Sequence, residues 1–236
     1  MANKTLYQHG TLGALMAGLM DGTASIANLL EMGDFGIGTL HGLDGEVIIL
    51  NGQAFQGKSD GALIKLSGTE MTPYAAVANF KADRQFFFEE SVTSDETLMK
   101  IKNEFKSNNI FSAIKLTGKF DKMHIRIMPK QEKPYKRLVE VSKIQPEFER
   151  NNIKGTLVGF FTPELFQGVA AAGFHLHFIS EDKTFGGHVM DFELASGVLE
   201  ISDFDTMTQL FPINDPTFLN NDIDYADLAS EIEQAE

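Results

Sequence analysis

The 236-residue sequence contains no cysteine and no tryptophan. Without cysteine there is no disulfide framework, no cysteine-ligated zinc finger and no thiol nucleophile, so a bound metal would need histidine, aspartate or glutamate ligands. Cationic side chains are also few, 20 against 33 acidic ones, which gives a formal charge of -13. This charge repels phosphate backbones and anionic lipids, so we expect neither a nucleic-acid partner nor a membrane partner.

Long apolar runs are missing as well. No stretch approaches the roughly 20 apolar residues of a membrane span, and the first ten residues lack the apolar segment of a secretory signal. We therefore expect a cytoplasmic protein. With 43% hydrophobic residues, the chain is long enough to bury the core of a globular enzyme in one or two domains.

Three helices are predicted in the first half of the chain. Residues 11–20 are apolar nearly all round and rich in good helix formers. Thr23 or Ser25 can cap a second short helix, and Thr93 with Glu96 forms a capping box for a third. The apolar character of the first two helices predicts that they are buried.

Strands account for most of the remaining chain. Asp44-Gly45 and Asn51-Gly52 are strong hairpin signals. Residues 77–90 are predicted as one strand, and the run of phenylalanines at 86–88 suggests burial on both of its faces. The polar stretch 131–134 ends in proline and is a plausible linker between two halves, the second of which is dominated by strands.

Half of the six histidines lie in GFHLHFISEDKTFGGHV, residues 173–189. Residues two apart on a strand share a face, so His175 and His177 should point together. If the chain turns at Asp182-Lys183, residues equally far from the turn face each other, and His177 is then opposite His188. Three imidazoles would converge on one ion and leave a coordination position open, as in catalytic zinc sites.

The histidine cluster also allows other interpretations. The side chains could be polar positions on a solvent-facing strand, or hydrogen-bonded core histidines, and a slip of one residue at Gly186-Gly187 would turn His188 away. The pattern H-x-H-x-x-x-E, completed by Glu181, is also that of a cupin-like iron enzyme, although the hairpin puts Glu181 at its turn. A third alternative is a metal-dependent binding module without catalysis.

Two charged residues outside this cluster are candidates for chemistry. Arg126 stands in a strand of otherwise apolar character, and a buried guanidinium needs a carboxylate from the protein or from a substrate. Glu46 follows the glycine of a tight turn, where a carboxylate can cap backbone N–H groups or move a proton. Together they are consistent with Lewis-acid chemistry on a small anionic substrate.

Four segments carry a resemblance to a known family: LYQHGTLGALMAGLMDG, GDFGIGTLHGLDGEVIILNGQAFQ, HIRI and GFHLHFISEDKTFGGHV. In this order, from about residue 5 to residue 212, the chain resembles the alpha-acetolactate decarboxylase family. The resemblance implies a two-domain α/β (α+β) homodimer, with a mixed sheet in the N-terminal half and a smaller barrel-like mixed sheet carrying the metal in the C-terminal half. We place these units at residues 1–132 and 133–212, followed by an acidic tail, 213–236, that packs near the active site.

The resemblance also implies roles for individual residues. The family's zinc ligands correspond to His175, His177 and His188, and its active-site residues to Glu46, Arg126 and Thr39. The family further brings a C-terminal glutamate over the metal; among the glutamates of EIEQAE we favour Glu233.

The implied activity is that of a zinc-dependent acetolactate decarboxylase, a carboxy-lyase of acetoin biosynthesis. Its substrate would be the small hydroxy-keto acid 2-acetolactate (2-hydroxy-2-methyl-3-oxobutanoate), converted to acetoin and carbon dioxide through a zinc-stabilised enediolate. Arg126 would orient the substrate carboxylate and Glu46 would deliver the proton. The cupin interpretation leaves Arg126 unexplained, and the binding module gives Glu46 no role.

Overall fold

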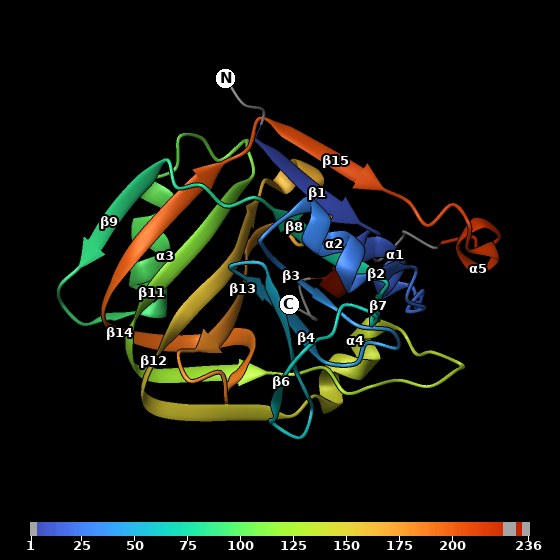
Figure 1. Ribbon diagram of the computed structural model, residues 1–236, viewed down its shortest axis with the longest axis horizontal. Helices are drawn as coiled ribbons and strands as arrows, with labels where there is room; N and C mark the ends of the chain where they lie inside the picture. Colours follow the sequence, from blue (N-terminus) through green and yellow to red (C-terminus); the bar gives the residue numbers. More distant parts are fainter. Residues whose placement is uncertain (1–3, 224–229, 233–236) are drawn as a thin grey trace.

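The computed structural model describes residues 4–223 and 230–232, and two β-sheets contain most of the strands in this part of the chain (Figure 1). In sheet order, the strands of the first sheet are β15 (Thr206–Leu210), β1 (Thr5–His9), β8 (Tyr74–Ala78), β3 (Phe35–Thr39), β4 (Glu46–Leu50), β5 (Gln53–Gly57) and β6 (Leu63–Lys65). Parallel pairing joins β1 to β15, while the other neighbours in this sheet are antiparallel. The first sheet is therefore mixed, as predicted.

The second sheet closes on itself. Its strands in order are β10 (Val92–Thr93), β14 (Gly186–Asp203), β11 (Ser112–Arg126), β12 (Glu147–Thr162) and β13 (Gly173–Ser180), with β9 (Arg84–Phe88) also paired to β14. Because β14 pairs with both β11 and β13, the four long strands form a small barrel. The predicted barrel-like sheet is confirmed, but its pairings are antiparallel rather than mixed, since each long strand runs opposite to both of its neighbours.

Short helices and one further strand pair complete the described structure. The helices are α1 (Leu12–Met16), α2 (Ile26–Met32), α3 (Ser94–Asn103), α4 (Leu138–Val141) and α5 (Pro216–Leu219), with 3-10 turns η1 (Ser142–Ile144) and η2 (Glu164–Phe166). Strand β2 (Ala24–Ser25) pairs with β7 (Met71–Thr72). In Figure 1, α3 lies with the second sheet on one side of the molecule, and α1 and α2 lie with the first sheet on the other. No helix in the described part of the chain has both the length and the apolar character needed to cross a bilayer.

The local signals in the sequence explain where several elements begin. Ser25 caps α2 by accepting from the backbone N–H of Asn28, and Thr93 and Glu96 form the predicted capping box of α3. Asn51 and Gly52 take positive φ angles of 52° and 70° in the turn between β4 and β5, the backbone that this pair of residues favours. The helix predicted over residues 11–20 is shorter than expected and covers Leu12–Met16.

Residues 77–90 differ from the prediction of one strand buried on both faces. The segment is split between β8 in the first sheet and β9 in the second, and Phe87 is 67% exposed. The physical reason is that only one face of β9 packs against the barrel core: Phe86 and Phe88 lie on that face, and Phe87 points to the opposite, solvent-facing side.

Apolar side chains fill both faces of the first sheet. One face packs against the outside of the barrel through residues such as Phe35, Ile48 and Phe160. The opposite face packs against α2, where Ile26 and Leu29 are buried. Burial on two faces explains why β3, β4 and β8 do not alternate with polar residues; their polar exceptions, Thr39 and Glu46, lie at the ends of β3 and β4.

The barrel has a separate core of its own, to which α3 contributes. The two sheets draw strands from both sides of residue 132: β9, β10 and β11 precede it and join the barrel, whereas β15 follows it and joins the first sheet. The division of the chain into units 1–132, 133–212 and 213–236 concerns folding units and stays a prediction.

Phe120 offers a test of how the barrel is stabilised. Its ring is fully buried and packs edge-on against Phe178 and Phe192. Phe120→Ala should lower the free energy of unfolding by about 3–5 kcal/mol, because it removes buried apolar surface and leaves a cavity. Urea denaturation measures this, with Phe87→Ala as the matched control, expected to change stability by no more than about 0.5 kcal/mol. Equal losses in the two variants would contradict this account of the core.

Candidate metal centre and active site

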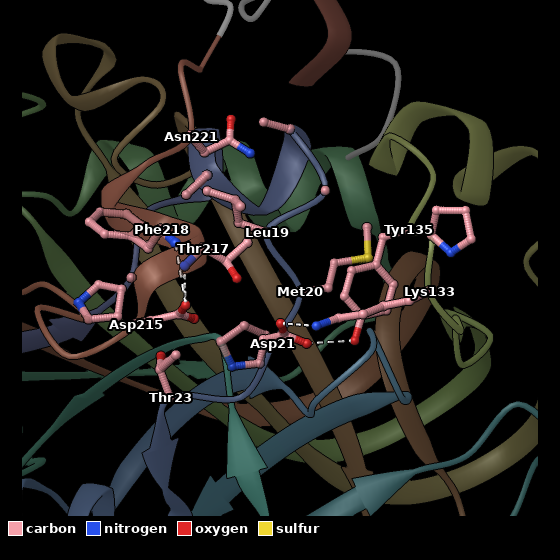
Figure 2. Close-up of a pocket in the computed structure, with 17 residues that line it drawn as sticks. Leu19, Met20, Asp21, Thr23, Lys133, Tyr135, Asp215, Thr217, Phe218 and Asn221 are labelled. Carbon is pink, nitrogen blue, oxygen red and sulfur yellow. Dashed lines mark hydrogen bonds and ion pairs between the residues drawn. The ribbon is translucent and has the colours of Figure 1, made fainter.

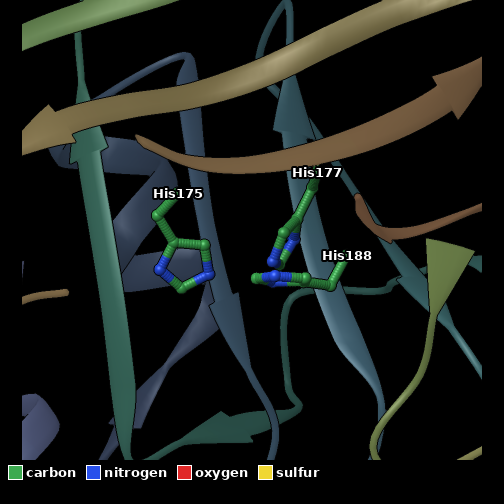
Figure 3. Close-up of side chains that lie close together, drawn as sticks. All are labelled: His175, His177 and His188. Atoms are coloured by element: carbon green, nitrogen blue, oxygen red, sulfur yellow. The ribbon is translucent and has the colours of Figure 1, made fainter. Parts of the chain in front are cut away.

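The β-ladder between β13 and β14 brings the three predicted histidines together. His177 lies directly opposite His188, and Ile179 lies opposite Gly186, so the hairpin has the predicted register without a slip. His175 lies two residues before His177 on the same face of β13. Figure 3 shows the three rings converging, and their ligand nitrogens all lie within 4.8 Å of one another.

His177 is oriented by a strand of the first sheet. Its Nδ1 lies 2.9 Å from the backbone oxygen of Val47 on β4, and since a carbonyl can only accept, Nδ1 carries the proton and donates it. Nε2 therefore keeps its lone pair; it is buried, with no hydrogen-bond partner among the described atoms. A buried imidazole nitrogen whose ring is held from the other side by a carbonyl is the arrangement expected of a metal ligand.

Burial keeps two of these imidazoles neutral. Burial, together with the positive charge of Arg126, lowers the pKa of His175 to about 3. Burial also holds the pKa of His177 well below its ordinary value, although the hydrogen bond to Val47 acts in the opposite direction. Because a metal binds neutral imidazole, both side chains are ready to act as ligands near pH 7. The donor set thus fits a divalent ion held by three nitrogen ligands.

Arg126 ends β11 and lies across the ladder from His188. It is only 2% exposed, so its charge sits inside the protein. Nη1 donates to Oε1 of Gln145 at 3.1 Å, and Nη2 lies 3.1 Å from Nε2 of His188. The predicted arginine therefore belongs to the same site as the histidines, and Gln145, which the sequence did not single out, contacts it.

Glu46 and Thr39 enter the site from the first sheet, where they lie opposite each other on β4 and β3. Glu46 Oε1 accepts from the backbone N–H of Met128 at 3.1 Å, and Oε2 lies 3.5 Å from Nε2 of His177. Thr39 donates its hydroxyl proton to the carbonyl of Gly45, immediately before Glu46. Glu46 thus both caps a backbone N–H, the simpler of its two predicted roles, and approaches the histidines.

A small cavity of about 40 Å³ connects these groups. Polar residues from both sheets line one part of it: Thr39, Glu46, Arg126, His175 and His188. Most of the other lining residues form an apolar wall: Leu12, Leu15, Leu43, Met128 and Leu138. Sequence analysis predicted that the helix containing Leu12 and Leu15 is buried, but nothing in its pattern indicated that it covers the site.

The C-terminal end of the described chain packs against this apolar wall. Ile232 is buried in the same cluster as Leu12 and Leu138, and the carboxylate of Glu231 forms two hydrogen bonds with the guanidinium of Arg137. Glu231 was one of the three glutamates considered for the site. Glu233, the one we favoured, lies outside the described residues.

The cupin alternative loses its carboxylate ligand. Glu181 is exposed at the turn after β13, where the hairpin model puts it, and it does not join the metal-ligand group found among the described residues. Among the described residues, the candidate ligand group consists of His175, His177 and His188.

A larger cleft of about 630 Å³ lies elsewhere, between the chain around Met20, the segment 133–135 and α5 (Figure 2). Its most prominent polar groups satisfy one another: Asp21 accepts hydrogen bonds from both Lys133 and Tyr135. None of the histidines of the metal centre lines it. Of these two cavities, only the smaller one is lined by the candidate catalytic residues and by histidines of the candidate metal centre.

Comparison with known proteins identifies what this arrangement is similar to. The family model described as "Alpha-acetolactate decarboxylase" matches residues 6–225. An alpha-acetolactate decarboxylase of Lactococcus lactis is 49% identical over 231 residues, which cover 98% of each chain. Another, from Streptococcus thermophilus, is 44% identical over 234 residues, again 98% of each chain.

Solved structures agree with this comparison. A Staphylococcus aureus protein, described as of unknown function and similar to alpha-acetolactate decarboxylase, superposes with a TM-score of 0.97 at 51% identity and covers 98% of this chain and 100% of its own. The alpha-acetolactate decarboxylase of Bacillus subtilis gives a TM-score of 0.95 at 36% identity, over 98% of this chain and 99% of its own.

The histidine cluster predicts a metal-binding experiment. His188→Ala removes one of three converging nitrogens, so binding of Zn2+ to chelator-treated protein should weaken by at least 100-fold when measured by competition with a chromogenic chelator. His124→Ala is the control, because His124 hydrogen-bonds Glu147 outside the cluster and should leave zinc binding unchanged. Tight stoichiometric zinc binding by the His188 variant would argue against this centre.

The lowered histidine pKa values predict how stability depends on pH. In the metal-free protein, His175 and His177 stay neutral in the folded state, whereas an unfolded histidine takes up a proton near pH 6.5. Stability should therefore be fully present above about pH 6.5 and fall as the pH drops towards 3. Urea unfolding of chelator-treated protein between pH 8 and 4.5 measures this. His175→Gln should have a shallower slope below pH 6.5; an unchanged slope would show that His175 is not buried neutral.

Proposed function

Because the chain belongs to the alpha-acetolactate decarboxylase family, we propose that it converts 2-acetolactate to acetoin and carbon dioxide with a bound zinc ion. The observation that carries this proposal is that a buried arginine, a buried glutamate and two histidines of the three-histidine cluster line one cavity, while the third, His177, lies 3.5 Å from the glutamate. Each of these groups has a use in decarboxylating a hydroxy-keto acid.

The reaction itself makes clear what the site must supply. In 2-acetolactate, one carbon carries the carboxylate, a hydroxyl and the acetyl group. When the bond to the carboxylate breaks, carbon dioxide leaves and the electron pair forms an enediolate, which takes up one proton to give acetoin. A zinc ion held by His175, His177 and His188 would supply a Lewis acid that stabilises this negative charge without any change of oxidation state.

Arg126 is suited to bind the substrate carboxylate. A guanidinium stays charged at every accessible pH and offers paired N–H donors that match the two oxygens of a carboxylate. Arg126 lines the cavity beside His175 and His188, so a substrate oriented by it would have its reacting carbon next to the metal ligands.

Glu46 is suited to deliver the proton. Its Oε1 is fixed by the Met128 backbone, which leaves Oε2 on the side of His177. We therefore assign proton transfer to Oε2. Thr39 supports this role indirectly, because its hydroxyl group holds the turn from which Glu46 projects. A further carboxylate from Glu233 is part of the proposal on the strength of the family resemblance alone.

The apolar wall has a separate function. Leu12, Leu15 and Leu138 border the cavity opposite the charged groups and limit the access of water. Electrostatic interactions strengthen where water is excluded, and the methyl groups of the substrate find apolar neighbours there. We further propose a homodimer, for which the resemblance to the family is the support, and keep the cytoplasmic location as a prediction from the sequence.

Turnover by the purified protein tests the proposal. Zinc-loaded protein incubated with racemic 2-acetolactate should release acetoin and carbon dioxide in equal amounts, measured by chromatography and by carbon dioxide evolution. Arg126→Ala should retain its zinc while kcat/KM falls by about 100-fold or more, because the substrate carboxylate loses its charged partner. Chiral chromatography of the acetoin would also report whether one face of the enediolate receives the proton.

Arg150→Ala is the matched control. Arg150 is exposed, donates to Thr184 and stacks over Phe185 at the end of the barrel, without lining the cavity. Its replacement should leave kcat and KM unchanged. Normal kinetics in the Arg126 variant would remove Arg126 from the mechanism, and an inactive zinc-loaded parent protein would refute the proposed reaction.

A further inference from the structure

Arg126 needs more than burial to serve as a carboxylate receptor. Its neighbours Ile125 and Ile127 are fully buried in the barrel core, so the backbone of the strand is well fixed. The side chain beyond it is long, and the plane of its guanidinium decides which donors face the cavity. Contacts that hold this plane are therefore functional contacts if Arg126 binds substrate.

Two contacts of the guanidinium lie at hydrogen-bonding distance to other described residues. Nη2 contacts Nε2 of His188 on β14, and Nη1 donates to Oε1 of Gln145, each at 3.1 Å. The histidine contact comes from a candidate metal ligand, and the glutamine contact comes from a segment outside both sheets. The two contacts hold the guanidinium through different nitrogens.

The contact to His188 cannot be kept in every state of the site. An imidazole nitrogen has one lone pair, which it can give to a guanidinium N–H or to a metal ion but not to both. If His188 binds an ion through Nε2, Arg126 loses this contact. Of the two contacts, the one to Gln145 is compatible with metal binding through either nitrogen of His188.

The backbone of Gln145 is fixed independently of the metal centre. Gln145 directly follows η1 and precedes Pro146, which restricts it to the extended conformation that it adopts, with φ −67° and ψ 134°. The carbonyl of Pro146 accepts from the N–H of Ile127, one residue beyond Arg126. Gln145 is thus held close to Arg126 by the main chain, and only its side-chain rotamer remains to be set.

The chemical type of residue 145 also has a consequence. An amide oxygen accepts a hydrogen bond without bringing a negative charge, whereas a carboxylate at the same place would form an ion pair with the guanidinium. An amide can therefore orient Arg126 and leave its positive charge to attract an incoming carboxylate.

We propose that Gln145 is a positioning residue: its side-chain oxygen holds the guanidinium of Arg126 in the plane that receives the substrate carboxylate. This inference rests on the proposed function, because it assigns Gln145 to the same site. It adds a residue that neither the sequence motifs nor the resemblance to the family indicated.

Two variants of the zinc-loaded full chain test the inference. Gln145→Leu keeps a similar volume but removes the acceptor, and kcat/KM should fall at least tenfold while the zinc content stays at the level of the parent. Gln145→Glu keeps an acceptor, so the variant should fold normally. Its added negative charge would form an ion pair with Arg126 in place of the substrate carboxylate, so KM should rise at least tenfold. If Gln145 only supplied a hydrogen-bond acceptor to the buried Arg126, the glutamate variant would instead have a KM equal to or lower than that of the parent.

Binding provides a readout that does not need turnover. The Kd of 2-hydroxy-2-methylpropanoate, an unreactive α-hydroxy carboxylate, can be measured by calorimetry on the parent and on both variants. It should rise at least tenfold in each variant. Gln209→Leu is the control, because Gln209 donates to the carbonyls of Gly10 and Leu210 in the first sheet, and its loss should lower the melting temperature without changing Kd, kcat or KM.

The outcomes separate the two proposals. A parent protein that does not decarboxylate 2-acetolactate refutes the proposed function, and the calorimetric Kd values then still decide whether Gln145 orients Arg126 towards carboxylates. An active parent with unchanged KM, kcat and Kd in both Gln145 variants overturns the inference and leaves the proposed function standing.

Discussion

The pairing of β13 with β14 sets the position of every candidate metal ligand. This short ladder closes the barrel, and one of its pairs is His177 with His188. Because side chains alternate along a strand, a shift of one residue would turn His188 to the other face and separate the ligands. The register is fixed at the turn, where Ser180 accepts hydrogen bonds from the N–H groups of Thr184 and Phe185. The structural ladder and the metal centre are therefore one feature.

Contacts between the two sheets complete the site. The backbone of Val47 in the first sheet holds the ring of His177 in the barrel, and Glu46 in the first sheet holds the N–H of Met128 just beyond β11. The carbonyl of Met128 in turn accepts from the N–H of Gly45, so the bond between the segments runs in both directions. Since the histidines come from one sheet and the glutamate from the other, any loosening of this contact would separate Glu46, the proposed proton donor, from the candidate metal ligands.

How much of this the sequence could predict depends on the range of the interaction. The hairpin register of the histidines, the capping box at Thr93 and the turn at Asn51 are local, and local spacing predicted them. The exposure of Phe87 was predicted wrongly, because it depends on the tertiary packing that covers only one face of β9. Gln145 was missed for the same kind of reason, since nothing in the residues around it reveals that it contacts Arg126.

The electrostatics of the centre follow from placing a permanent cation beside buried imidazoles. The burial of His175 and His177 lowers their pKa values, and the positive charge of Arg126 lowers them further, so both imidazoles stay neutral. Neutral imidazoles repel the guanidinium less and can give their lone pairs to a metal. The arginine thus serves two purposes in the proposed site: it attracts an anionic substrate, and it helps keep the ligands deprotonated. Replacing Arg126 by a neutral residue would weaken both effects together. In the proposed site, the neutral amide of Gln145 would orient the guanidinium without placing a negative charge beside it.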